Sequence, residues 1–209
     1  MDTNYLVTKS NYFIKNSAFD LSLEEQRIIL ILASMVQPED TDFKNYTMKV
    51  SDFIEVLGIK TENKYSKLPK ITKELMQKIL EINDEETGEF LQVAWLSAVK
   101  YKKNSGEIEL EFSPHLKPYL LDLKGFYTQY RLSNILSMKS KYSPRFYELL
   151  KMNEYQKKGC IISVEELRRL FKAETIYPLY ADFKKYIILQ TQKELEQFSD
   201  IRFEFEEIK

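Results

Sequence analysis

The residues best suited to chemistry in this 209-residue chain are lysines that gather in one stretch. Six lysines and two glutamates lie between Lys60 and Lys78, a local balance of +4 (six minus two) in a chain of formal net charge −1. Five acids and no base follow from Glu81 to Glu89. Clustered cations attract a polyanion over long distances, and segregated acids keep it off the other surfaces. The pattern favours a protein that presents one basic surface to a polyanion.

Residues for catalysis or metal binding are sparse. The single histidine, His115, follows a strand pattern and precedes Pro118, which favours a surface or capping role. The single cysteine, Cys160, excludes an intrachain disulfide and a cysteine-rich metal site, and we interpret it as a small buried hydrophobe on a strand. The sequence has no glycine-rich phosphate loop and no metal-spaced cluster, and one histidine cannot supply the histidine pair of a nicking tyrosine enzyme. We predict a protein that is not an enzyme and that needs no cofactor or metal.

Composition indicates a folded protein outside the membrane. Hydrophobic residues make up 44% of the chain. The longest apolar run, Ile28–Val36 with Ser34 inside it, is too short to cross a bilayer. The N-terminus lacks the basic-then-apolar layout of a signal peptide, so we expect a cytoplasmic protein.

The elements that must position the lysines begin with an extended arm or short strand in residues 4–20. Ser22 and Glu25 form a capping box for a helix from Leu23 to about Val36, apolar nearly all the way round and therefore buried. A strand then covers Tyr46–Val50. Ser51 caps a short helix that Gly58 ends.

The lysine-rich stretch itself predicts a helix over Ser66–Leu80, with Ser66 as the N-cap and Pro69 in the first turn. An apolar face at spacings of three and four consists of Leu68, Ile71, Leu75 and Ile79. A basic stripe on another face consists of Lys67, Lys70 and Lys73. An ordinary solvated face remains an alternative interpretation of this stripe.

A β-hairpin is expected directly after this helix. Phe90–Tyr101 and Glu107–Phe112 alternate as strands do, and Asn104–Gly106 suits the turn between them. The basic residues at its tip are Lys100, Lys102 and Lys103. A helix with a basic face followed by a basic hairpin is how a wing is built. A short helix from Pro114 to about Leu121 and a connector, residues 122–125, complete this half.

The second half shows a similar order of elements. Ser143 is the expected N-cap of a helix with Pro144 at its first position, and a short strand follows at Cys160–Ile162. Ser163 and Glu166 form a second capping box. The remaining elements are a long helix, Tyr180–Phe198, and an alternating strand, Ile201–Ile208, after which the sequence stops.

The two halves can be laid over each other as an internal repeat. The segment beginning at Ser51 matches the one at Ser163, and Lys73–Gln77 matches Lys193–Gln197. We therefore predict an α+β protein with two tandem winged-helix domains, residues 1–123 and 124–209. The second wing is expected to be truncated.

Taken together, these segments resemble the plasmid replication initiator (Rep) proteins of the tandem winged-helix type. The resemblance covers essentially the whole chain, through the order and spacing of several segments. They are Leu23–Arg27, Phe126–Tyr130, Ser140–Leu150, Ile162–Arg168, Tyr180–Lys185 and Ile201–Lys209.

The resemblance implies an initiator that binds directly repeated origin sites in double-stranded DNA and recruits host replication proteins. Many such proteins also bind their own operator as dimers, which implies a homodimer and repression of its own promoter. Each domain is expected to place its third helix, Ser66–Leu80 or Tyr180–Phe198, in a major groove. The implied DNA-binding residues, with those of the wing, are Lys64, Lys67, Lys70, Lys73, Lys100, Lys102, Lys103, Lys139, Lys141, Arg145, Asp182, Lys184 and Lys185. Among them Lys139, Lys141 and Arg145 would meet phosphate beside the second groove.

Two other classes of function stay open at this point. A transcriptional regulator with tandem winged helices would share the fold and the duplex binding. A protein-docking or dimerisation module would instead use the acidic tract Glu81–Glu89 or the strand Ile201–Ile208, and its behaviour toward DNA would be indifferent to salt.

Overall fold

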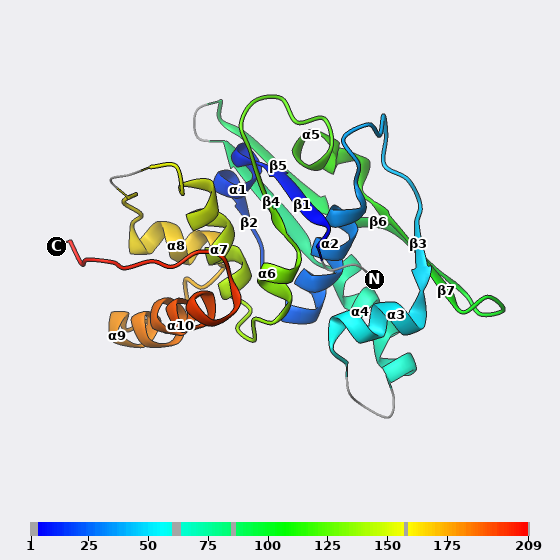
Figure 1. The fold of residues 1–209 in the computed structure, drawn as a ribbon. Coiled ribbons are helices and arrows are strands. Elements are labelled where there is room, and N and C mark those ends of the chain that lie inside the picture. The colour runs from blue at the N-terminus through cyan, green and yellow to red at the C-terminus, as the bar shows by residue number, and fades with distance from the viewer. Residues whose placement is uncertain (1–3, 60–63, 85–86, 157–158, 209) are drawn as a thin grey trace.

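The computed structural model of the protein describes residues 4–59, 64–84, 87–156 and 159–208 (Figure 1). Its first part, up to the first wing, contains β1 (Leu6–Ser10), α1 (Asn11–Asn16), β2 (Ser17–Ala18), α2 (Leu23–Met35), β3 (Tyr46–Lys49), α3 (Val50–Leu57), α4 (Lys64–Met76), β4 (Ile79–Asp84), β5 (Glu89–Ala94), β6 (Leu96–Lys102) and β7 (Glu107–Phe112). The remainder contains η1 (Pro114–Leu116), α5 (Lys117–Leu120), β8 (Tyr127–Arg131), α6 (Ser133–Leu136), α7 (Ser143–Met152), α8 (Val164–Leu170), α9 (Tyr180–Phe183), the π-helical turn η2 (Lys184–Ile188) and α10 (Leu189–Phe198).

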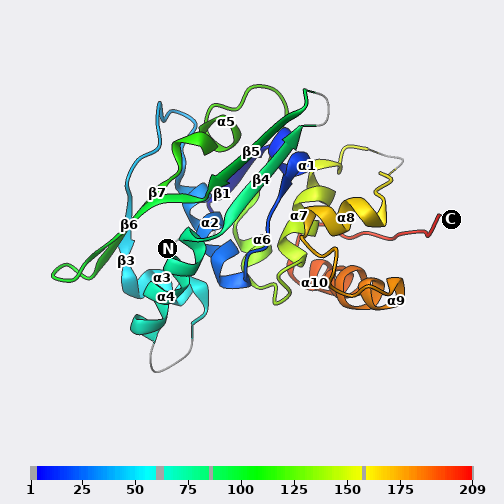
Figure 2. The ribbon, with the colours of Figure 1, turned by 180° about the vertical axis from the view of Figure 1, so that it is seen from behind.

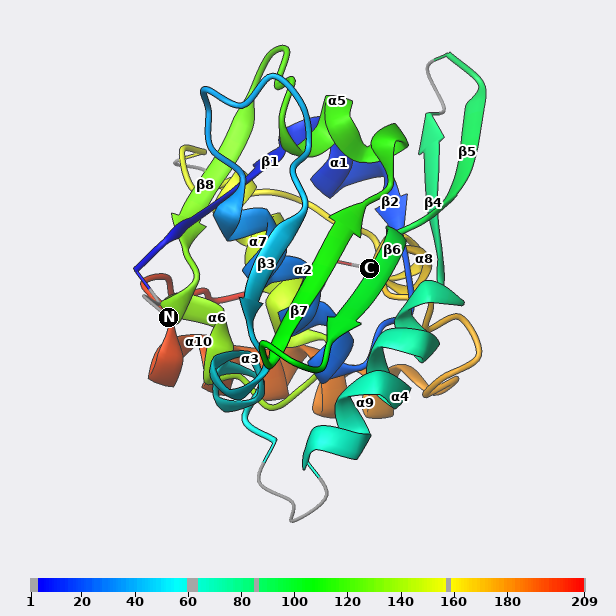
Figure 3. The ribbon, with the colours of Figure 1, turned by 90° about the vertical axis from the view of Figure 1, so that its right-hand side faces the viewer.

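Within the described residues the strands form three small antiparallel sheets, ordered β1–β8, β2–β4–β5 and β3–β7–β6. The third sheet carries the wing, because β6 and β7 are joined by the hairpin that the sequence predicts, and Figure 3 shows it beside α4. In the first sheet Leu6 lies opposite Arg131, so a strand from the middle of the chain closes on the N-terminal strand.

Two hydrophobic cores lie side by side. The larger one surrounds α2, whose residues from Ile28 to Ala33 are all buried, as the sequence predicts. The smaller one gathers α7, α8 and α9 around Phe146, Leu170 and Phe183. Helix α7 serves both cores, since Tyr147 packs into the first and Phe146 into the second.

Several predicted helix starts differ from the structure, but the serine caps predicted for α2 and α8 are both present. Ser22 and Glu25 form the full box at α2, and Ser163 caps α8. Ser51 and Ser143 do not cap. Helix α3 starts two residues earlier than predicted, with Lys49 in place of Ser51 as its cap residue, and Ser143 is buried with its hydroxyl 3.2 Å from that of Thr191. A serine near a helix start can thus serve the core in place of the backbone.

The basic helix α4 is also shifted from its prediction. It is helical from Lys64, so Ser66 is not its N-cap and Pro69 lies inside it. Leu68, Ile71 and Leu75 face the core as expected, whereas Ile79 starts β4 and is 49% exposed.

The strand expected over residues 90–101 is two strands of different sheets. The chain changes sheet at Trp95, whose fully buried ring makes edge contacts with Phe13 and Phe19 at centroid distances of 6.1 and 5.0 Å. Residues 4–20, expected to be an extended arm or one short strand, form β1, α1 and β2.

The strands predicted at Cys160–Ile162 and Ile201–Ile208 do not form. Residues 160–162 and 201–208 carry no ladder hydrogen bonds, and Cys160 and Ile161 are exposed, which corrects the interpretation of Cys160 as a buried residue. The alternation in residues 201–208 reflects one-sided packing, because the Phe203 ring stacks on Phe146 at 5.4 Å. An apolar alternation needs a neighbouring strand to become a ladder, and the described residues supply none here.

Candidate nucleic-acid interface

Helix α4 carries the basic stripe on the face opposite its buried residues. Lys70 and Lys73 are exposed, and the Lys70 ammonium lies 4.0 Å from the Glu74 carboxylate, an exposed pair that contributes little stability. Lys67 is half-buried and lies 3.4 Å from Glu24 at the start of α2. The side chain of Lys64 lies outside the described residues. The stripe therefore offers two outward ammonium groups and a third that is tied to α2.

The wing is fixed to α4 by a side-chain hydrogen bond. The hydroxyls of Thr72 on α4 and Tyr101 on β6 are 3.0 Å apart, and Thr72 is buried. Lys100 and Lys103 are exposed near the hairpin tip, whereas Lys102 forms a 2.7 Å ion pair with Glu109 across the ladder. This pair lowers the pKa of the Glu109 carboxyl, because the ammonium hydrogen-bonds its charged form. The wing thus has exposed ammonium groups at Lys100, which lies opposite Glu109 in the ladder, and at Lys103, and an internal partner for Lys102.

The corresponding helix of the second half runs from α9 through η2 into α10. Near its start Asp182 is half-buried, Lys184 is paired with Glu207, and Lys185 is exposed with its ammonium 5.0 Å from the Tyr186 ring centroid. Ion pairing raises the pKa of Lys184, since Glu207 hydrogen-bonds the ammonium form. Compared with α4, this helix presents one unpaired lysine among the residues singled out from the sequence.

The three basic residues expected beside the second groove have different environments. Lys139 is exposed on the loop between α6 and α7, which Glu194 fixes by accepting the backbone N–H of Lys139 at 3.2 Å. Lys141 is half-buried and forms a 2.7 Å ion pair with Asp20.

The structure contradicts the expected contact between Arg145 and phosphate. It is buried, and its guanidinium donates to the carbonyls of Ile14 and Ser17 and lies 3.3 Å from Glu148. All residues in the first turn of α7 are buried. The sequence does not reveal this burial, because the turn contains both polar and apolar residues.

Helix α4 and the helix formed by α9 and α10 lie on one side of the molecule, the lower side in Figure 1 and again from behind in Figure 2. The loop that carries Lys139 lies between them on this side. Strands β4 and β5, which carry the described acids of the acidic tract (Glu81, Asp84 and Glu89), run from α4 toward the opposite side, whereas Glu85 and Glu86 lie outside the described residues. The basic and acidic segments separated in the sequence are thus also separated in space.

Two family models match the chain in succession. The model described as "Initiator Replication protein, WH1" matches residues 6–151, and "Initiator Rep protein, WH2" matches residues 163–209. The chain belongs to the initiator Rep protein family. Its two winged-helix domains and its α+β architecture are those that the sequence predicts.

Individual members of this initiator family are similar over much of the chain. The "Replication initiation protein" of Escherichia coli is 29% identical over 194 residues, which cover 89% of this chain and 60% of that protein. The "PI protein" of Escherichia coli is 26% identical over 148 residues, 64% of this chain and 48% of that protein. The chain therefore spans about half to three fifths of the length of these relatives.

A solved protein shows the same fold. The crystal structure of Pi initiator protein in complex with iteron DNA superposes with a TM-score of 0.75 at 19% identity, over 97% of this chain and 90% of that one. The two family models place β8 and α7 with the first winged helix, whereas the boundary expected from the sequence lies after residue 123. The pairing of β8 with β1 explains why these elements accompany the first half.

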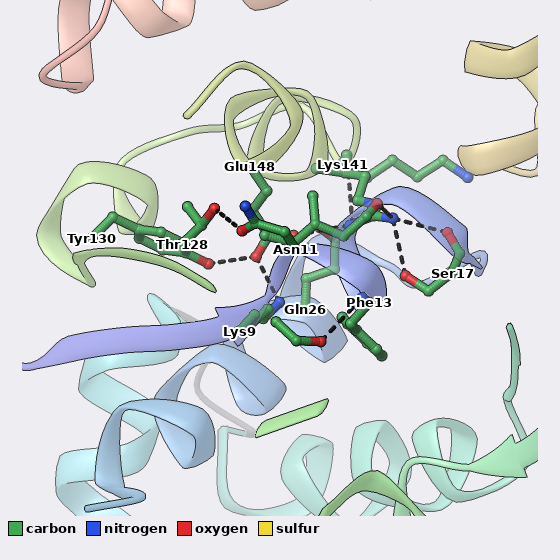
Figure 4. A network of polar contacts seen from close by, with 12 residues as sticks. Lys9, Asn11, Phe13, Ser17, Gln26, Thr128, Tyr130, Lys141 and Glu148 are labelled. Carbon is green, nitrogen blue, oxygen red and sulfur yellow. Dashed lines mark hydrogen bonds and ion pairs between the residues drawn. The ribbon is translucent and has the colours of Figure 1, made fainter. Parts of the chain in front are cut away.

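Sequence reasoning missed the buried polar residues that join the N-terminal strand β1 to α7, the helix shared by both cores. We call this cluster the joint. Lys9 of β1 donates to Glu148 of α7 at 2.6 Å, Tyr130 of β8 donates to the same oxygen, and Figure 4 shows both converging on this carboxylate. All of these side chains are buried. Burial by itself would raise the pKa of Glu148, but the Lys9 and Arg145 cations outweigh it and lower that pKa. The segments around Tyr130 and Glu148 contribute to the family resemblance, yet no local pattern marks them as partners.

The parts of the chain that the structure describes contain neither a metal-binding cluster nor a membrane-spanning helix. There, no group of three histidine, cysteine, aspartate or glutamate side chains could hold a metal ion. No described helix combines the length and apolarity required to cross a membrane.

Proposed function

We propose that the chain initiates plasmid replication by binding directly repeated sites in double-stranded DNA through both winged helices. The observation that carries the proposal is the placement of α4 and α9–α10 on one side of the molecule, each following a short helix, α3 or α8 (Figure 1). The likeness to an initiator solved with iteron DNA supports the same assignment. In this arrangement one face of a duplex meets both helices.

The residues divide into two groups by their surroundings. Exposed ammonium groups with no ion-pair partner among the described residues, such as Lys73, Lys103 and Lys185, are suited to phosphate, where they supply affinity and salt dependence. Residues on the two helices also reach base edges, where Asp182 would accept from a cytosine amino group. The full proposed set is Lys64, Lys67, Lys70, Lys73, Lys100, Lys102, Lys103, Lys139, Lys141, Asp182, Lys184 and Lys185. Those already in ion pairs, such as Lys141 with Asp20, must exchange that partner for phosphate.

Further parts of the proposal follow from the family. We infer that the protein recruits host replication proteins at the origin, forms a homodimer that represses its own promoter, and works in the cytoplasm without catalysis of its own. The common requirement of all these roles is sequence-specific binding of duplex DNA.

A salt titration of binding tests that requirement. The wild type and the Lys70→Ala/Lys73→Ala double variant are titrated with a duplex that carries direct repeats, chosen from the DNA that flanks the gene, and with a scrambled duplex. If both lysines contact phosphate, the double variant lowers the slope of log K against log salt by about 1.8. Lys124→Ala, an exposed lysine in the connector that follows α5, the helix on the upper side in Figure 1, is the control and keeps the wild-type slope.

Two outcomes contradict the proposal. Equal affinity of the wild type for repeated and scrambled duplexes at physiological salt removes sequence-specific recognition. An unchanged slope in the double variant removes α4 from the interface.

A further inference from the structure

The turn between α8 and α9 contains two residues whose backbone conformation is intrinsically unfavourable. Lys172 and Tyr177 have φ values of 49° and 55°, in the left-handed region that residues with a side chain rarely occupy. Such conformations persist where surrounding contacts hold them. This turn leads directly into α9–α10, the helix proposed to enter the second major groove, which we call the second reading helix. The contacts that stabilise the turn therefore also position that helix.

Arg168 on α8 supplies the contacts. Its Nη1 donates to the carbonyls of Ala173 at 3.1 Å and Ile176 at 3.0 Å. Its Nη2 donates to the carbonyls of Tyr177 at 2.7 Å and Pro178 at 3.4 Å. One guanidinium therefore gathers four carbonyls of the turn, which the planar fork of arginine can do and a single ammonium cannot.

The same guanidinium also touches the reading helix. Its central carbon lies 4.5 Å from the ring centroid of Phe183, a fully buried residue in the last position of α9. At the far end of the turn the Tyr177 ring stacks on Tyr186 at 5.0 Å. Arg168 is thus linked to both sides of the segment that carries Asp182, Lys184 and Lys185.

We propose that Arg168 is a positioning residue that sets the place of the second reading helix in its groove, and with it the base discrimination of the second winged helix. The proposal rests on the DNA-binding function proposed above. Arg168 acts through the turn and makes no contact with DNA. Base-edge hydrogen bonds depend on sub-ångström placement, whereas phosphate attraction tolerates small displacements.

The test compares Arg168→Gln with Arg169→Gln. Both substitutions remove one positive charge from neighbouring positions, but Arg169 bonds only to Glu166 among the hydrogen bonds found for it, at 2.9 and 3.3 Å. Discrimination is measured as the affinity ratio between the repeated-site duplex and duplexes mutated in the part of the site that the second domain protects. We expect Arg168→Gln to lower this ratio roughly tenfold, the size of one good base contact, with the salt slope unchanged. Arg169→Gln keeps the ratio.

A second measurement needs no DNA. Amide hydrogen exchange in residues 173–180 should accelerate in Arg168→Gln and not in Arg169→Gln, while exchange in α10 stays slow in both. If Arg168→Gln loses protection in α10 as well, the domain has unfolded and Arg168→Lys replaces it, because lysine keeps the charge and the stem but not the fork. That variant should lose part of the discrimination.

The outcomes separate the two proposals. A wild type without preference for the repeated duplex overturns the proposed function, and exchange in residues 173–180 then still decides whether Arg168 holds the turn. A wild-type ratio in Arg168→Gln, or in Arg168→Lys where the first variant unfolds, overturns the positioning role. A salt slope reduced by about one in Arg168→Gln also overturns it, because Arg168 would then itself contact phosphate.

Discussion

Each winged helix holds the segment next to its reading helix with one arginine, but the two arginines reach different distances along the chain. Arg27 of α2 donates to the carbonyl of Leu57 at the end of α3, at 2.8 Å, and to those of Leu136 and Met138, at 2.7 and 3.0 Å. Arg168 binds carbonyls at most ten residues away. The first arginine therefore joins three distant segments, and the second closes a local turn.

This difference indicates that the first domain is coupled to the joint at α7, whereas the second domain is organised locally. The loop at Leu136–Met138 leads into α7, the helix shared by both cores. A change at Arg27 or in the joint should propagate to the whole molecule. A change at Arg168 should stay in the second domain.

The joint itself should give the largest effect on stability. Glu148→Gln leaves Lys9 and Arg145 buried without their counter-charge, which we expect to lower the free energy of unfolding by about 3–5 kcal/mol. Urea unfolding, followed by fluorescence and by far-UV circular dichroism, measures the loss and shows whether both probes move together. Glu196→Gln, an exposed glutamate on α10, is the control and should change it by less than about 0.5 kcal/mol. A loss confined to one of the two probes would contradict a shared joint.

The pH dependence of stability examines the same carboxylate. Its pKa is lowered in the folded protein, so its contribution is present above the pKa of the unfolded chain and is lost as pH falls through the folded value. Wild-type stability should therefore decrease below about pH 4, and Glu148→Gln should lack this part of the decrease. Parallel pH profiles of the two proteins would exclude Glu148 as its source.

Arg27 offers a second way to separate a coupled domain from a local one. Arg27→Gln should lower the free energy of unfolding by about 2–3 kcal/mol, because hydrogen bonds from a charged donor to three carbonyls are lost. Hydrogen exchange should accelerate in both α3 and α7. Arg131→Gln, an exposed arginine of β8, serves as the control. Acceleration of exchange in α3 alone would mean that the effect of Arg27 is confined to its own domain, as is expected for Arg168.

Local sequence patterns correctly predicted the elements that are stabilised by interactions between residues close together in the chain. The capping box at Ser22, the buried face of α2 and the turn of the first wing all depend on residues close together in the chain, and all are confirmed. The alternation of residues 201–208 is typical of a strand, but a strand also needs a neighbouring strand to pair with, and the described residues supply none. The division of the predicted strand at Trp95 depends on the distant rings of Phe13 and Phe19.

The candidate site divides in the same way. The outward direction of Lys70 and Lys73 follows from the helical period and is found in the structure. The burial of Arg145 depends on carbonyls more than 120 residues away, at Ile14 and Ser17, which no local pattern reveals. Arg27 and Arg168 lie within the segments that carry the family resemblance, but their work on backbone carbonyls appears first in three dimensions.

The two serine caps give the smallest and sharpest comparison of the domains. At α2 the box is complete, with Ser22 donating its N–H to Glu25 at 2.7 Å and its hydroxyl accepting the Glu25 N–H at 3.3 Å. At α8 Ser163 accepts the Glu166 N–H at 3.0 Å, but the Glu166 carboxylate is bonded to Arg169.

We expect Ser22→Ala to lower the free energy of unfolding by about 1 kcal/mol and Ser163→Ala by about half as much, since α2 is the more buried helix and its box is complete. Urea unfolding of both variants with Ser137→Ala, an exposed serine, as a control measures the difference. A larger loss from Ser163→Ala would mean that the second domain depends more on its local caps than the first domain does. That result would strengthen the contrast between a locally held domain and a coupled one, while removing the complete capping box as its explanation.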